Sequence, residues 1–261
     1  MSAPEEIAES GPRGLRAIAF EAVLAFATLT AWRIPGAGRQ TSVEQRARAM
    51  LFLPIAGLTL GVALALIDHL LAAVASPLSR SATVIAISIL AGGAIGPVGL
   101  AHAIGELRAG RRPSWTGLTE IGPTGALAAL AFAGLEIWLL GTIARPPARA
   151  EALVLATMLS RWAIVPVGYG LKPLERMGLG VPWEGGIRFR EFAGSSVLAF
   201  GIAMGLYDVV GIAAIVVMAF VILALRLLFS RRLGGADGYA LAGGASVCEL
   251  ATFAIMAALR F

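Results

Sequence analysis

The sequence contains little charge. Only 14% of its 261 residues are charged and 58% are hydrophobic, whereas roughly a quarter of the residues in ordinary soluble domains are charged. A soluble bundle needs a polar face on every helix, and the long apolar runs of this chain have none. The composition therefore excludes a soluble domain and predicts an integral membrane protein.

Cysteine is nearly absent as well. Cys248 is the only one, which excludes an internal disulfide framework and a thiolate metal cluster. It lies in an apolar run, where a packed and unreactive thiol is expected. Polar and apolar residues do not alternate with period two over the length of a membrane strand, so strands are not expected either.

The positive charges do not form a nucleic-acid surface. The net charge is +5, and of the 21 basic residues one is Lys172 and the others are arginines. They are spread over the connections between apolar runs instead of along one stripe. We therefore expect the lipid bilayer, and no nucleic acid, as a partner of this chain.

Apolar runs of about 20 residues, the length that crosses roughly 30 Å of hydrocarbon, recur along the chain. An earlier run, Leu15–Trp32, contains Arg16 and Glu21 and either crosses the membrane or lies in its interface. Residues 1–14 are predicted to be a disordered tail, and residues 15–261 a single membrane domain. The fold class is all-α, a polytopic helix bundle of about seven helical segments: Met50–Val74, Ala82–Ile104, Pro123–Ile143, Ala152–Tyr169, Phe192–Leu206, Val209–Phe229 and Tyr239–Leu259.

The connections between these segments alternate in charge. The connections 33–49, 105–122, 170–191 and 226–232 hold 14 cations, and the intervening connections with the C-terminus hold 4. The positive-inside rule places the four arginine-rich connections in the cytoplasm. We expect a multi-pass protein of the bacterial inner membrane whose long loops converge on one cytoplasmic site.

Ionisable residues inside the apolar runs are candidates for chemistry. Asp68 and His69 are adjacent and form either a proton relay or a hydrogen-bonded pair at a helix end. Glu136 and Glu249 lie near the middle of their runs, where each is either functional or protonated and bonded to a neighbouring helix. His102 follows a glycine-rich stretch and has no second metal ligand nearby, so a structural role is expected.

A local signal for anion binding lies at 231–238. Arg231 and Arg232 precede Gly234 and Gly235, just before a predicted helix start. Backbone N–H groups at such a turn and the guanidinium groups suit a phosphate or pyrophosphate. The alternative is a membrane-edge turn whose arginines only set the orientation.

Taken together, the scattered motifs resemble one family. They are Phe26, Leu29-Thr30, Arg33-Ile34-Pro35, Phe52, Pro54, Gly57, Gly61, Ser160-Arg161-Trp162, Tyr169, Gly178-Leu179-Gly180, Arg232-Leu233-Gly234-Gly235, Gly238, Leu241 and Glu249-Leu250. Their order and spacing are similar to those of the cobalamin synthase family, cobalamin 5′-phosphate synthase or adenosylcobinamide-GDP ribazoletransferase. The resemblance implies a membrane transferase that joins α-ribazole, or its 5′-phosphate, to adenosylcobinamide-GDP with release of GMP.

The resemblance also implies Mg²⁺ as cofactor, held by carboxylates on the pyrophosphate. The family supplies these in a glycine- and aspartate-rich segment that corresponds to Gly92–Glu106, where no aspartate remains. His102 and Gly105 occupy two acidic positions, and Pro97 or Val98 the third. Elsewhere Glu136 stands where the family has a lysine, and Tyr239 and Ser246 stand at two further acidic positions.

The resemblance and the local signals together give a set of site residues. The implied catalytic residues are Glu249 and Glu106; the phosphate-binding residues are Arg231, Arg232, Gly234, Gly235 and Arg161; and the weak metal ligands are Glu106, Glu120 and Asp237. The expected partner is a nucleotide-bearing corrinoid, and a homo-oligomer is left open. The alternatives are a catalytically inactive relative that serves as a membrane scaffold or binding protein, and a small transporter.

Overall fold

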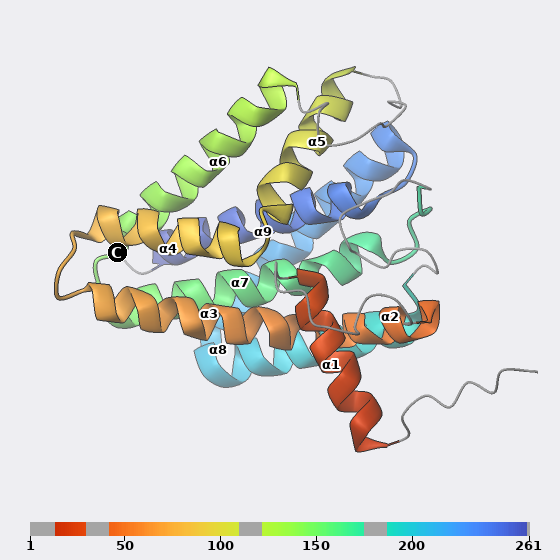
Figure 1. Cartoon of the computed structure of the whole chain (residues 1–261), viewed down its shortest axis with the longest axis horizontal. Coiled ribbons are helices and arrows are strands. Elements are labelled where there is room, and N and C mark those ends of the chain that lie inside the picture. Colours follow the sequence, from red (N-terminus) through yellow and green to blue (C-terminus); the bar gives the residue numbers. More distant parts are fainter. Residues whose placement is uncertain (1–13, 30–41, 110–121, 175–186, 260–261) are drawn as a thin grey trace, which may run out of the picture.

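The computed structural model describes residues 14–29, 42–109, 122–174 and 187–259, and within these ranges the chain is helical, with no strand beyond one isolated β-bridge between Pro173 and Ala236 (Figure 1). Residues 1–13 of the predicted tail lie outside the described residues. The helices are α1 Leu15–Leu29, α2 Val43–Ala49, α3 Leu53–Leu71, α4 Pro77–Ala91, α5 Ile95–Ala109, α6 Pro123–Thr142, α7 Pro146–Gly168, α8 Phe189–Leu228 and α9 Gly238–Leu259.

The helices fit a membrane bundle. Among the described residues, five helical stretches are long and apolar enough to cross a membrane, or six if the bent pair α4 and α5 is counted as one span. Helix α1 has 15 residues, fewer than the roughly 20 that a crossing takes. In Figure 1 it runs at a steep angle to α3 and α8. The prediction of a polytopic all-α membrane protein is confirmed.

Helix α8 contains two antiparallel halves. At Asp208 the backbone is non-helical, with φ 44° and ψ −124°, a left-handed φ that a non-glycine residue rarely adopts. A methyl group added to Gly211 would collide with the backbone carbonyl of Ala203, eight residues earlier. Only a chain that doubles back brings these two positions together, so the predicted boundary between Leu206 and Val209 is correct.

The predicted span Ala82–Ile104 is broken. Helix α4 ends at Ala91 and α5 starts at Ile95, and their axes differ by 83°. Gly93 and Ala94 between them both have positive φ, 63° and 57°, which ends a helix because right-handed helical geometry needs negative φ. Hydropathy did not show this break, because Gly92, Gly93 and Ala94 interrupt the run without any charged or strongly polar side chain.

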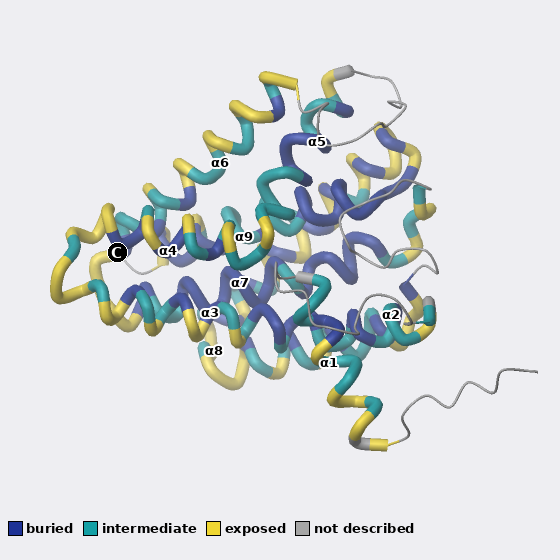
Figure 2. Tube along the Cα trace, viewed as in Figure 1, coloured by how far each residue is buried: buried dark blue, intermediate teal, exposed yellow. Residues whose placement is uncertain are grey.

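Helix α7 forms the centre of the bundle, and Figure 2 shows it buried along nearly its whole length. Its neighbour α3 approaches through glycine: a methyl group at Gly57 would lie 2.8 Å from the Cα atom of Met158. A second close approach joins α5 and α9, where a methyl at Gly99 would lie 2.7 Å from the backbone nitrogen of Gly243. Small residues allow membrane helices to pack this closely.

The two ends of the bundle differ. At one end the connections are short: 72–76 joins α3 to α4, 143–145 joins α6 to α7, and α8 reverses at Asp208. The helix ends joined by the first two connections lie together at the left of Figure 1, next to the end of α9. At the other end lie the starts of α2 and α9 and the end of α7. The described residues next to three of the arginine-rich connections lie at this second end.

Candidate functional site

A polar pocket lies at the break between α4 and α5. Its cavity volume is about 70 Å³, room for only a few water molecules. Helices α4, α5, α6, α7 and α9 all contribute to its wall. The charged or hydroxyl-bearing side chains of the wall are Ser88, Glu136, Arg161, Ser246 and Glu249.

Arg161 and Glu249 form an ion pair across α7 and α9. The Arg161 Nη1 atom donates to Glu249 Oε2 at 2.6 Å, and both side chains are 12% exposed. Ser160 joins the same group, since its Oγ accepts from Arg161 Nη1 at 2.7 Å and donates to Glu249 Oε2 at 3.3 Å. A charge-assisted bond of this length fixes the guanidinium in position. The sequence assigned Arg161 and Glu249 separate roles, and the structure brings them together.

Glu136 reaches the same pocket from α6. The residue is 9% exposed, and no hydrogen bond or ion pair joins its carboxylate to another residue of the described ranges. The charges of Glu249 and Arg161 act on it. The sequence identified Glu136 only as an isolated acid, because helical spacing does not show which way α6 is rotated in the bundle.

A second group of predicted residues lies where α5 packs against the start of α9. The rings of His102 and Tyr239 are 4.7 Å apart between centroids. Asp237 caps α9, because its Oδ1 accepts from the backbone N–H of Ala240 at 2.8 Å. Glu106 on α5 is buried, 7% exposed. The structure thus gives His102 a packing contact and Asp237 a capping bond.

The described residues do not form the carboxylate cluster that the resemblance implies for Mg²⁺. No group of three or more His, Cys, Asp or Glu side chains within 14–29, 42–109, 122–174 and 187–259 is placed to hold a metal ion. Glu120 lies outside the described residues. Mg²⁺ takes near-octahedral oxygen coordination, and Pro97, one of the two candidates for an acidic position of the resembled family, lines the pocket without supplying a ligand.

The arginine-rich turn before α9 is already hydrogen-bonded internally. A π-helical turn, Phe229–Leu233, ends in Gly234 with φ 74°. The N–H groups of Gly234 and Gly235 both donate to the carbonyl of Phe229. These two amides are engaged within the turn, whereas Arg231 and Arg232 are exposed. Any phosphate here would therefore be held by the guanidinium groups.

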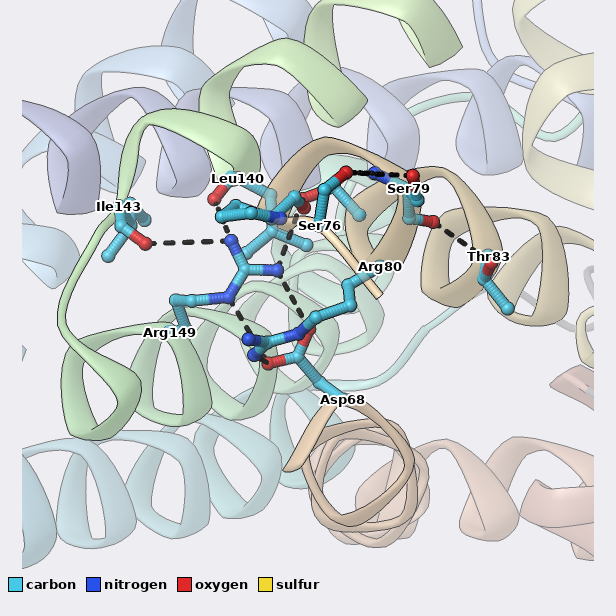
Figure 3. Close-up of polar contacts among 10 residues, drawn as sticks. Asp68, Ser76, Ser79, Arg80, Thr83, Leu140, Ile143 and Arg149 are labelled. Carbon is cyan, nitrogen blue, oxygen red and sulfur yellow. Dashed lines mark hydrogen bonds and ion pairs between the residues drawn. The ribbon is translucent and has the colours of Figure 1, made fainter. Parts of the chain in front are cut away.

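A separate charge cluster ties the opposite end of the bundle together (Figure 3). Asp68 of α3 accepts from Arg149 of α7 at 2.7 Å and 3.1 Å, and also from Arg80 of α4. Arg149 further donates to Ser81 Oγ at 3.1 Å and to the carbonyl of Leu140, near the end of α6, at 2.5 Å.

The predicted pairing of Asp68 with His69 does not describe this arrangement. The partners of Asp68 are arginines of other helices, and His69 is exposed. The cluster is buried on all sides, with Asp68, Arg80 and Arg149 each at most 7% exposed. It therefore serves the packing of four helices.

Comparison with known proteins gives two matches. The model of the family described as cobalamin-5-phosphate synthase matches residues 21–258 of this chain. A curated protein of Roseiflexus sp. (strain RS-1), named adenosylcobinamide-GDP ribazoletransferase, is 35% identical to it over 148 residues. That stretch covers 54% of this chain and 53% of the relative, so the match spans about half the length of each. No solved structure matches the chain.

Proposed function

This chain belongs to the cobalamin-5-phosphate synthase family, and from that premise we propose that it is a membrane transferase of late cobalamin biosynthesis. It joins α-ribazole, or its 5′-phosphate, to adenosylcobinamide-GDP and releases GMP. We further propose that it lies in the bacterial inner membrane, with the arginine-rich connections in the cytoplasm where nucleotide substrates are present.

The observation that carries the proposal is the position of the polar pocket. It is lined by parts of three segments that the comparison with the family singles out: Gly92–Glu106, where the family has its acidic segment, Ser160-Arg161-Trp162 and Glu249-Leu250. These segments lie far apart in the sequence and meet at the break between α4 and α5. Polar groups that converge at a cavity inside a membrane bundle support an active site at this place.

The proposed reaction is a phosphoryl transfer. A ribose hydroxyl attacks the phosphorus that carries cobinamide; a new P–O bond forms, the P–O bond to GMP breaks, and GMP leaves with the electron pair. The hydroxyl proton passes to a carboxylate, for which Glu249 and Glu106 are the candidates. Arg161, held by Glu249, supplies a fixed positive charge for the phosphate oxygens. Arg231 and Arg232 are the proposed contacts for substrate phosphates at the membrane surface.

Mg²⁺ has no step in this proposal, because the described residues offer no carboxylate cluster to hold it. The same observation favours a second candidate, a non-catalytic relative that keeps the scaffold and binds the corrinoid nucleotide without turning it over. A small transporter, the third alternative, gains support only from the broken helix.

The test is release of GMP from adenosylcobinamide-GDP by the purified protein in nanodiscs, with and without α-ribazole, in Mg²⁺ and in EDTA. We expect release that depends on α-ribazole and falls about 100-fold or more in Glu249→Gln, which keeps the shape of the side chain but cannot accept the proton. Glu44→Gln is the matched control, since Glu44 pairs with Arg48 on α2 and does not line the pocket. Folded protein that binds the nucleotide but releases no GMP under any condition would establish the non-catalytic alternative.

A further inference from the structure

The charges in the pocket do not balance. Glu136 and Glu249 carry two negative charges when ionised, and Arg161 carries one positive charge that is already bonded to Glu249 at 2.6 Å. Glu136 is more than nine-tenths buried and lines the cavity. A buried carboxylate without a counter-charge is strongly unfavourable in a medium of low dielectric constant. A neutral pocket therefore takes one further positive charge, which is either a proton on Glu136 or a bound cation.

The helix ends at the pocket do not supply that charge. Gly92 follows the C-terminal end of α4 and Ile95 begins α5, and both residues line the cavity. The C-terminal end of a helix is partly negative and the N-terminal end is partly positive, so the two ends offset each other. The charge balance is set by the side chains.

The lining chemistry and the size of the cavity define what fits. Besides the two carboxylates, the wall presents the hydroxyl groups of Ser88 and Ser246, so all of these groups offer oxygen atoms as ligands for a cation. A cavity of about 70 Å³ has room for a small ion with one or two waters. Broken helices at membrane depth are places where membrane proteins bind monovalent cations.

We propose that the pocket binds one small monovalent cation, held by Glu136 with help from Ser246 and Ser88. The shared chemistry of the ligand is a single positive charge on a body no larger than Na⁺, K⁺ or ammonium. A divalent ion is not the expected ligand, because the excess in the pocket is one negative charge while Arg161 stays bonded to Glu249. The proposal stands on the charge and size of the pocket and does not rest on the transferase function.

The test uses the whole protein in nanodiscs, exchanged into choline chloride, whose cation is bulkier than Na⁺, K⁺ or ammonium. The unfolding temperature is followed by tryptophan fluorescence while NaCl, KCl or NH₄Cl replaces choline chloride at constant ionic strength. A specific cation raises the unfolding temperature by about 5 °C or more at a hundredfold excess over its Kd. Binding of radioactive ²²Na⁺ gives the stoichiometry directly, with one ion per chain expected for a sodium site.

Three variants separate the proposal from a general salt effect. Glu136→Gln removes the charge and should abolish the cation-dependent shift, whereas Glu44→Gln, at an exposed carboxylate, should keep it. Ser246→Ala should weaken the apparent Kd severalfold, and this variant carries the test if Glu136→Gln does not fold.

The proposal is overturned by either of two results. The first is an unfolding temperature that is the same in choline as in all three test salts, which would mean that a proton on Glu136 supplies the missing charge. The second is a cation-dependent shift that survives in Glu136→Gln, or that is unchanged in Ser246→Ala where Glu136→Gln does not fold. The transferase assay is independent, so a failure there leaves this result intact.

Discussion

Replacing Asp68 with leucine leaves the guanidinium groups of Arg80 and Arg149 buried without a counter-charge. Leucine is also larger than aspartate, so a smaller overpacking cost adds to the loss of the counter-charge. Both arginines are at most 7% exposed, and the tight turn between α3 and α4 keeps Arg80 close to the cluster. Neither side chain therefore gains water easily when the carboxylate is lost.

The magnitude follows from the behaviour of buried ion pairs. Removal of one partner of such a pair costs roughly 3–5 kcal/mol, because a buried charge is left uncompensated, whereas replacement of all partners by apolar residues is often neutral. We expect Asp68→Leu to lower the free energy of unfolding by about 3–5 kcal/mol. The triple variant Asp68→Leu, Arg80→Leu, Arg149→Leu should recover more than half of this loss. It still loses about 1 kcal/mol because the Leu140 carbonyl loses its donor.

Equilibrium unfolding in mixed micelles of dodecyl sulfate and a mild detergent, followed by circular dichroism, measures both values. With the double variant Arg80→Leu, Arg149→Leu added, the single and triple variants complete a cycle that gives the coupling between the charges. A loss below about 1 kcal/mol in Asp68→Leu would contradict the argument, because it would show that the arginines are solvated. A triple variant less stable than the single one would show that the cluster contributes net attraction.

Two further predictions concern packing and orientation. Gly57→Ala should lower the free energy of unfolding by about 1–3 kcal/mol, because the new methyl meets backbone atoms of α7. Gly201→Ala is the control, and it should be neutral or stabilising because nothing lies within 4 Å of the added methyl. Equal unfolding curves for the two variants would refute the close approach. In a Cys248→Ala background, cysteines introduced at Arg188 and Arg232 should resist a membrane-impermeant thiol reagent in intact cells. Labelling of both would reverse the orientation.

The apolar runs predicted most of the fold because membrane helices must satisfy their backbone bonds within each segment. Six of the seven predicted segments correspond to α3, α6, α7, α9 and the two halves of α8, and the reversal at Asp208 falls between two of the predicted segments. The break at Gly93 was missed. Hydropathy carries no information on backbone dihedral angles, and the only sequence feature that indicated a break was the pair of glycines shortly before Pro97.

The sequence predicted which residues belong to the candidate site, but not how their side chains are arranged. Arg161 and Glu249 were identified singly, and their ion pair depends on how α7 and α9 are rotated about their axes. Asp68 was identified too, but its partner Arg149 lies 81 positions away. Long-range contacts of this kind are fixed by tertiary packing, which one sequence without an alignment does not reveal.

The short connections at one end of the bundle also limit where the protein can carry a movable segment. Five residues, three residues and the reversal at Asp208 are all that joins the helices there. So few connecting residues leave little chain from which a movable lid could be built. Any segment that closes over a bound ligand is therefore expected at the other end of the bundle, where α2 and α9 begin.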